Sequence, residues 1–488
     1  MLFNSLQFLI FFPIVVAIFF LIPQKRRWIL LLIASYYFYM CWKVEYIVLI
    51  IISTLIDYFV TQKMDKLKQK AKKKKWLYLS LISNLGILFG FKYFNFINEN
   101  IQSFFDHFNI FYNVPAYEAL LPVGISFYTF QTLGYTIDVY NGKTKAQKHL
   151  GVFAVFVSFF PQLVAGPIER SNRLLPQFFK KHKFSYERAR YGLQQMMWGF
   201  FKKVVIADRL AIVVDGVYNN LDNYSGFALI IATIFFTFQI YCDFSGYSDI
   251  AIGSARVMGF ELMENFKRPY FSKSIAEFWR RWHISLSTWF RDYLYIPLGG
   301  NRVVKWKWYY NLLITFLVSG LWHGANWTFI VWGALHGTYL ISAIIIKNPK
   351  DKLLNFLRIK GSKIHHVYQI IFTFTLASFA WIFFRANNIT DAIYVSSNLF
   401  TDVGDYTNLA SMQLKLRGLG VGMNDLLISF GLIIFMEAFH LYERGGDVWL
   451  KLKSKPKWLR WSVYYIIIFG ILFLSPHSRS NNFIYFQF

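Results

Sequence analysis

The stretch Leu312–Trp332, LLITFLVSGLWHGANWTFIVW, places an ionisable residue, His323, inside an apolar segment of membrane-spanning length. A transmembrane helix needs about 20 predominantly apolar residues. An ionisable side chain within such a segment is energetically costly, so by default it marks a functional site. The stretch therefore predicts a membrane-embedded fold with a candidate site at His323.

The composition of the remaining chain supports a membrane protein. Of the 488 residues, 56% are hydrophobic and 21% aromatic, which is too apolar for a soluble globule of this size. The apolar segments predict an all-α polytopic membrane protein with about 11–13 transmembrane or re-entrant helices. We expect one domain over residues 1–488, with N-terminal helices in 1–115, a core in 119–346 and C-terminal helices in 366–488.

The core segments differ from ordinary spans. Several are interrupted by Gly, Pro or polar residues and are shorter than the roughly 20 residues of a full crossing. Broken helices are tolerated at membrane depth only where they are buried in protein or line a cavity. The core is therefore expected to enclose a tunnel. The two cysteines, Cys41 and Cys242, lie in separate apolar runs, so we expect neither a disulfide framework nor a metal site.

The positive charge is concentrated in loops. The formal net charge is +26, and basic clusters occur at Lys25–Arg27, Lys63–Lys75, Arg170–Arg190, Lys267–Lys307, Lys347–Lys363 and Arg444–Arg460. Because short basic loops stay in the cytoplasm, these clusters predict the sidedness of the chain. Counting the crossings places both termini outside, with the opening Leu6–Ile22 as a retained first helix.

A second informative stretch is Phe278–Tyr293, which we expect to form one amphipathic helix with an aromatic face and a basic face. Arg280, Arg281 and Arg291 could attract a polyanionic cytosolic ligand, and a coenzyme A thioester fits that description. His283 would lie at the border of the two faces, beside a polar entrance. The alternative is an interfacial helix that only anchors in lipid headgroups. No nucleic-acid-binding fold is apparent.

Several motifs together resemble one protein family. The pair Trp322-His323-Gly324 and FWRRWHISLS (Phe278–Ser287) is similar to the membrane-bound O-acyltransferases, in particular the bacterial alginate O-acetyltransferase-like branch. Further agreements, spread over nearly the whole chain, are LPVGISFY (Leu121–Tyr128), FPQLVAGPI (Phe160–Ile168), YCDFSGYSD (Tyr241–Asp249) and the final FIYFQF (Phe483–Phe488).

The resemblance implies an enzyme built as a helical ring around a tunnel. It would pass acetyl from cytosolic acetyl-CoA, its donor substrate, across the bacterial inner membrane for O-acetylation of an extracytoplasmic polysaccharide. His323 and His283 match the catalytic histidines of the family. No resident cofactor is implied. The branch works with a secreted or membrane-anchored SGNH-type acetyltransferase, and FIYFQF would be part of its docking surface or an aromatic anchor in the outer interface.

Residue chemistry is consistent with these roles. Desolvation favours a neutral imidazole, so His323 would accept the proton of an attacking hydroxyl. If the segment is helical, Asn326 lies one turn later on the same face and its amide is a candidate donor to the oxyanion. Trp322 and Asp243 are candidates for further support of the site. His336 would lie about 220° around the helix from His323, which favours a structural role.

Two other functions fit the same residues. A related branch transfers D-alanine to teichoic acid, so another small acyl group is an enzymatic alternative. A transporter or assembly scaffold without chemistry is an alternative of another class, although transporters often contain internal repeats and none is visible here. The residues leave the glycan, its acetylated hydroxyl and a covalent relay open.

Overall fold

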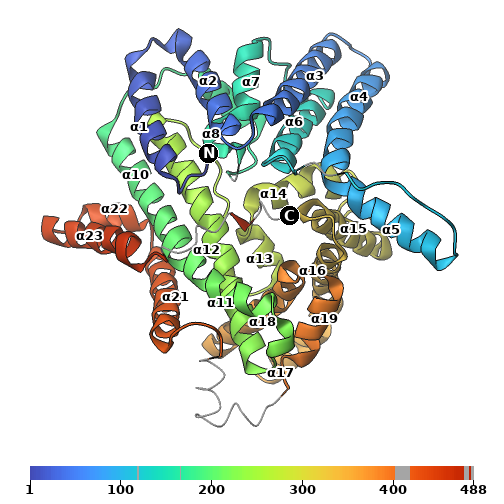
Figure 1. Cartoon of the computed structure of the whole chain (residues 1–488), viewed down its shortest axis with the longest axis vertical. Coiled ribbons are helices and arrows are strands. Elements are labelled where there is room, and N and C mark those ends of the chain that lie inside the picture. The colour runs from blue at the N-terminus through green and yellow to red at the C-terminus, as the bar shows by residue number, and fades with distance from the viewer. Residues whose placement is uncertain (118–119, 165, 402–417, 477–482, 485–488) are drawn as a thin grey trace. The chain divides into compact units, whose positions relative to one another are not determined.

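The computed structural model describes residues 1–117, 120–164, 166–401, 418–476 and 483–484, and helices account for the regular structure of these residues (Figure 1). The described chain forms two compact units, the first from Met1–Met196 and Ser248–Glu264, the second from Met197–Tyr247 and Asn265–Phe488. Seven of the described helices are long and apolar enough to cross a membrane. The all-α polytopic architecture is therefore confirmed.

The first unit contains the N-terminal helices. Their bounds are α1 Leu6–Leu21, α2 Arg27–Met40, α3 Ile47–Asp65, α4 Lys70–Leu88, α5 Phe94–His107, α6 Ile125–Tyr140, α7 Leu150–Ser158, α8 Phe160–Leu163 and α9 Ser171–Phe179. Helix α10 (Tyr186–Phe200) begins in this unit, and a π-helical segment, Phe201–Ala207, follows it.

Helix α4 does not end in a loop. A π turn at Phe89–Tyr93 carries it directly into α5. Apolar residues at Phe94, Ile97 and Ile101 have helical spacing, which explains the continuation. In contrast, the expected break in the core is present, because Phe159 separates α7 from the short α8.

A buried carboxylate joins two helices of the first unit, α3 and α4. Asp57 of α3 accepts hydrogen bonds from Ser80 and from Nδ2 of Asn84, both on α4, the latter at 3.0 and 3.1 Å. Ser53 donates to Oδ1 of Asn84 at 2.6 Å. In a membrane, such interhelical polar contacts hold helices together where apolar packing alone provides little preference over lipid.

The second unit contains the helices that carry most of the motifs. Their bounds are α11 Asp208–Tyr218, α12 Phe227–Met258, α13 Ile275–Arg281, α14 Ile284–Phe290, α15 Lys305–His323, α16 Trp327–Ile345, α17 Lys347–Phe356, α18 Lys363–Arg385, α19 Ile389–Asn398, α21 Met423–Glu443, α22 Val448–Lys453 and α23 Lys457–Leu474. Helix α12 runs on into the first unit at Ser248.

Helices α15 and α16 form the closest helix pair, lying side by side in Figure 1. A Cβ on Gly320 would lie 2.1 Å from the carbonyl oxygen of Phe329, and one on Gly333 would lie 2.3 Å from that of Phe316. Neither distance is sterically possible. The two glycines are therefore required by the approach of the backbones, as is common for small residues at membrane helix interfaces.

A buried ion cluster anchors the end of the chain in the second unit. Lys203 lies 2.6 Å from Asp243 and 2.9 Å from Asp208. The other oxygen of Asp243 accepts a hydrogen bond from the backbone N–H of Ile484 at 2.7 Å. The ring of Phe483 packs on Tyr247 with centroids 4.4 Å apart. The tail is thus held by both charge and aromatic packing.

This position changes the interpretation of the tail. Phe483 and Ile484 are 0% and 4% exposed, so they cannot form the exposed docking surface or the interfacial anchor that the aromatic composition suggested. Aromatic composition alone does not distinguish a buried segment from an interfacial one, and here the carboxylate of Asp243 decides the matter. The final residues 485–488 lie outside the described part of the chain.

We predict that Ile484→Pro lowers the thermal stability of the detergent-purified protein. Proline has no N–H, and loss of a hydrogen bond to a charged acceptor costs about 1.5–3 kcal/mol. Ile484→Val is the control, since it keeps the N–H and removes one buried methylene. Equal unfolding midpoints for the two variants would show that the Asp243 contact contributes nothing.

Candidate functional site

His323 is the last residue of α15 and lies inside the protein, 3% exposed. Three aromatic rings surround it, with centroid distances of 4.9 Å to Trp322, 5.0 Å to Trp332 and 5.3 Å to Phe384. The rings come from α15, α16 and α18. The imidazole therefore occupies an aromatic cage that excludes bulk water.

The backbone after His323 depends on glycine. A Cβ on Gly324 would lie 2.0 Å from Cε2 of Phe329, so any other residue would displace this ring. Phe329 in turn packs against Phe384 of the cage, with centroids 5.0 Å apart. In the Trp-His-Gly motif, His323 thus supplies the imidazole and Trp322 supplies one wall of its cage. Gly324 is of the only residue type that leaves room for Phe329 when α16 turns back against α15.

His283 does not lie within a continuous amphipathic helix, contrary to the prediction. Helix α13 ends at Arg281, and His283 has φ 41° and ψ 56°, the left-handed conformation. Asn265 stabilises this break, because its carbonyl accepts from the N–H of Ile284 and its side chain accepts from Ser285 Oγ at 2.7 Å. Left-handed residues other than glycine are uncommon and often mark functional sites.

The break turns His283 into the protein, so it does not line an open polar entrance as predicted. The side chain is 0% exposed, and desolvation lowers the pKa of His283 to about 3. Its imidazole packs on Phe244 at 4.6 Å and on Trp322 at 6.2 Å. Both motif histidines therefore contact one indole ring, that of Trp322.

The three candidate donor-binding arginines differ in their contacts. Arg281 forms an ion pair with Glu277 at 2.6 Å, and Arg291 forms one with its neighbour Asp292 at 2.8 Å. Arg280 is exposed at the end of α13 and has no ion-pair partner among the described residues. Arg280 is thus the arginine of this set whose guanidinium is free to meet an anionic ligand.

Asn326 does not follow His323 around one helix. Helix α15 ends at His323, and Asn326 is instead the N-cap of α16, accepting the N–H of Thr328 at 2.9 Å. Its amide donates to the carbonyl of Asn387 at 3.2 Å. The helical spacing behind the proposed oxyanion role is therefore wrong, because two helices meet between these residues.

Asp243 and Trp322 lie at different parts of the site. The ring of Trp322 contacts both His283 and His323, whereas Asp243 belongs to the ion cluster that holds Phe483 and Ile484. Phe244, the next residue on α12, touches both His283 and Phe483. Asp243 therefore supports the site through its helix, without contact to either histidine in the described structure.

His336 is closer to the site than sequence spacing indicated. It is on α16, antiparallel to α15, and its ring lies 4.9 Å from Trp332, which also packs on His323. Its Nδ1 accepts from the indole N–H of Trp279 at 3.2 Å. The missed signal was the spacing of Trp332 and His336, which places both on one face of the second helix.

One indole group of the cage, that of Trp332, and the adjacent indole group of Trp381 are left with hydrogen-bonding capacity. Within the described residues, the Nε1 atoms of Trp332 and Trp381 are buried and have no hydrogen-bond acceptor. The two rings stack with centroids 5.8 Å apart. An unsatisfied buried N–H is costly, so a donor retained beside a histidine is a candidate contact for a substrate oxygen. Sequence reasoning had not singled out either tryptophan.

Comparisons with known proteins agree with the geometry. The membrane-bound O-acyltransferase family model matches residues 148–384, which include both motif histidines and the cage. The chain is 42% identical to a probable alginate O-acetylase of Azotobacter vinelandii over 89% of this chain and 84% of the relative. It is 33% identical to a peptidoglycan O-acetyltransferase of Helicobacter pylori over 92% and 89%.

A more distant similarity involves a teichoic acid D-alanyltransferase of Bacillus subtilis, 29% identical over 46% of this chain and 60% of that protein. The long matches at the higher identities cover the two compact units and the motifs around His323 and His283. The chain therefore belongs to the membrane-bound O-acyltransferase family and is a polytopic membrane enzyme that transfers an acyl group to oxygen.

Proposed function

We propose that this enzyme transfers acetyl from cytosolic acetyl-CoA toward the outer side of the inner membrane, where an extracytoplasmic polysaccharide is O-acetylated. The named activities of the relatives with the longest matches support this function. The observation that carries the chemistry is the caged imidazole of His323, a buried base at the end of a helix.

The proposed acetyl transfer needs one base, His323, which first accepts and then returns a proton. Neutral His323 accepts the proton of an acceptor hydroxyl while the hydroxyl oxygen attacks the thioester carbonyl. The tetrahedral intermediate then collapses, the carbon–sulfur bond breaks, and the departing thiolate of coenzyme A takes the proton from the imidazolium. The products are an acetyl ester and free coenzyme A. The cage limits competing hydrolysis by excluding water.

The indole N–H of Trp332 is the proposed donor to the oxyanion. It lies on the ring that packs against His323 and has no acceptor among the described residues. A donor held in a water-poor site stabilises developing negative charge without reorganisation. This assignment replaces Asn326, whose amide is engaged with Asn387.

The binding site for acetyl-CoA is assigned to the basic end of α13. Arg280 is exposed and unpaired in the described structure, so its planar guanidinium can bind a phosphate of acetyl-CoA. The acceptor side is proposed to work with a secreted or membrane-anchored SGNH-type acetyltransferase, because the polysaccharide is large and His323 is buried. Co-purification from cells tests this partner.

One enzymatic alternative is retained. Transfer of D-alanine to teichoic acid is supported by relatives that match less than half of this chain. Labelled acetyl-CoA and a labelled D-alanyl carrier protein, offered separately to the purified enzyme, distinguish the two donors.

We predict that His323→Ala reduces acetyl-CoA turnover by about 10²–10⁴-fold, the usual cost of removing a general base. The readout is release of coenzyme A by the purified protein, with an unchanged unfolding midpoint. His440→Gln is the matched control, because His440 is also buried but hydrogen bonds to Tyr241 at 3.0 Å. Turnover within a few-fold of wild type would remove His323 from the mechanism.

His283 requires a variant that tolerates its backbone. Asn adopts the left-handed conformation readily, whereas Ala is strained there. Comparison of His283→Asn with His283→Ala in the same assay separates loss of the imidazole from distortion of the α13–α14 break.

We predict that Trp332→Phe lowers kcat by about 10²–10³-fold and leaves the KM for acetyl-CoA near wild type, since oxyanion donors act mainly in the transition state. The aromatic packing on His323 is kept in this variant. Trp381→Phe is the control for loss of a buried indole, because Trp381 packs against Trp332 and Phe384 of the cage. A Trp332→Phe enzyme with normal kcat would rule out the assigned donor.

The proposed direction of transfer predicts from which side of the membrane two introduced cysteines react with thiol reagents. In a Cys41→Ser background, which removes the exposed native thiol, a cysteine at Lys72 should react only with reagents that enter the cytoplasm. A cysteine at Thr390 should react from outside. Thr390 is preferred to Asn388, which caps α19. The reverse pattern would overturn the proposed orientation.

A further inference from the structure

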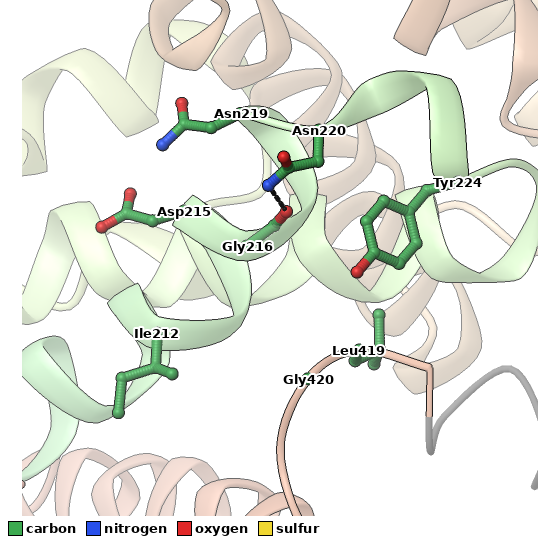
Figure 2. A pocket seen from close by; sticks show the side chains of 8 residues that line it. All are labelled: Ile212, Asp215, Gly216, Asn219, Asn220, Tyr224, Leu419 and Gly420. Carbon is green, nitrogen blue, oxygen red and sulfur yellow. Dashed lines mark hydrogen bonds between the residues drawn. The ribbon is translucent and has the colours of Figure 1, made fainter.

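A pocket of about 530 Å³ opens in the second unit at the end of α11. Figure 2 shows its lining, which is Ile212, Asp215, Gly216, Asn219, Asn220, Tyr224, Leu419 and Gly420. The volume falls within the roughly 300–1,000 Å³ of small-molecule sites. Asp215 and Asn219 are four residues apart on α11, so their side chains share one face.

Polar contacts connect this pocket with the loop after His323. Arg385, the last residue of α18, donates to Asp215 at 2.8 Å and to Asn219 at 3.3 Å. The amide of Asn387 also donates to Asn219, at 3.4 Å. The carbonyl of Asn387 accepts from Asn326, three residues after His323. The pocket and the site therefore share one polar framework.

The pocket lies at the ends of helices opposite to their basic ends. Helices α15 and α18 begin at Lys305 and Lys363, and α16 ends just before Lys347. Their other ends carry His323, Asn326 and Arg385. Because basic ends remain cytoplasmic, the pocket faces the outer side, where the proposed function requires an acceptor. The inference that follows rests on that function.

The lining has the chemistry of a site for hydroxyl and amide groups. Among the described residues, Asn219 Nδ2 and Asn220 Oδ1 have no protein partner, so one donor and one acceptor face the opening. The hydroxyl of Tyr224 donates to Gly418 at 3.0 Å and can still accept. Amides and hydroxyls suit a polyol, whose groups both donate and accept.

The charges of the lining residues favour uncharged sugars over acidic ones. Asp215 is the charged residue among the eight that line the pocket, and Arg385 neutralises it from behind. No lining residue supplies a cation for a second carboxylate. Because Arg385 is already paired with Asp215, a hexuronate placed here would bring a second carboxylate that has no cation to pair with, whereas an uncharged sugar brings no charge.

We propose that this pocket binds an uncharged sugar unit of the acceptor glycan, with an N-acetylhexosamine favoured over a hexuronate. Asn219, Asn220 and Tyr224 hold its hydroxyl and amide groups, and the Asp215–Arg385 pair leaves no cation for the carboxylate of an acidic sugar. The pocket thereby holds the glycan at the outer ends of the helices that carry His323.

Gly216 offers a sharp pair of variants. A Cβ there would meet only the carbonyl oxygen of Leu419, at an ordinary 3.7 Å, so Gly216→Ala fits while Gly216→Phe fills the pocket. The experiment titrates N,N′-diacetylchitobiose and a dimannuronate onto the purified full-length protein and onto both variants, without acetyl-CoA. Binding is followed by saturation-transfer NMR, and the unfolding midpoint checks each variant.

The expected result is chitobiose binding to wild type and Gly216→Ala, at least tenfold weaker binding to a folded Gly216→Phe, and weaker binding of dimannuronate throughout. Asp215→Asn should raise dimannuronate binding, because Arg385 is then unpaired. Equal chitobiose binding by Gly216→Phe, or a preference for dimannuronate in wild type, would overturn the proposal. So would a Gly216→Phe protein that binds sugar but loses a co-purifying partner protein. A failure of the proposed function would instead appear as absent acetyl-CoA turnover in wild type.

Discussion

The close contact of α15 with α16 is the constraint on which the site depends. With hydrogen atoms as side chains, Gly320 and Gly333 let the two backbones touch, and Gly324 leaves room for the ring of Phe329. This approach brings Trp332 of the second helix onto the imidazole at the end of the first. In lipid, where apolar surface has little preference for protein over acyl chains, such close packing is a main source of helix association.

A second constraint is the pairing of the buried charges of Lys203, Asp208 and Asp243. Lys203 is buried between Asp208 and Asp243, and neighbouring Lys202 donates to Ser245 at 2.8 Å. Charges are retained in a low-dielectric interior only when they are paired and hydrogen bonded. Asp243 uses its remaining oxygen for the chain end. The same α12 then presents Phe244 to His283, so the position of the tail and the wall of the site are set by one helix.

The site combines an apolar centre with polar edges. His323 is enclosed by aromatic rings, while the helix ends next to it are joined by Asn326, Asn387 and Arg385. An apolar cage shields the imidazole from bulk water, and polar groups at the helix ends satisfy backbone atoms and remain available to ligands. This division suits the proposed transfer, in which donor and acceptor approach from different sides of a membrane.

Sequence by itself determined the all-helical membrane fold and singled out His323 as a candidate site residue, because apolar length and an ionisable residue within an apolar segment are local properties of the chain. The ordered motifs determined the family. Tertiary structure alone decided that Asn326 caps a second helix, that His283 sits in a left-handed break, and that Phe483 and Ile484 are buried. It also revealed Trp332 beside His323. These features arise from contacts between residues far apart in the chain, and neither periodicity nor composition records which surfaces will meet.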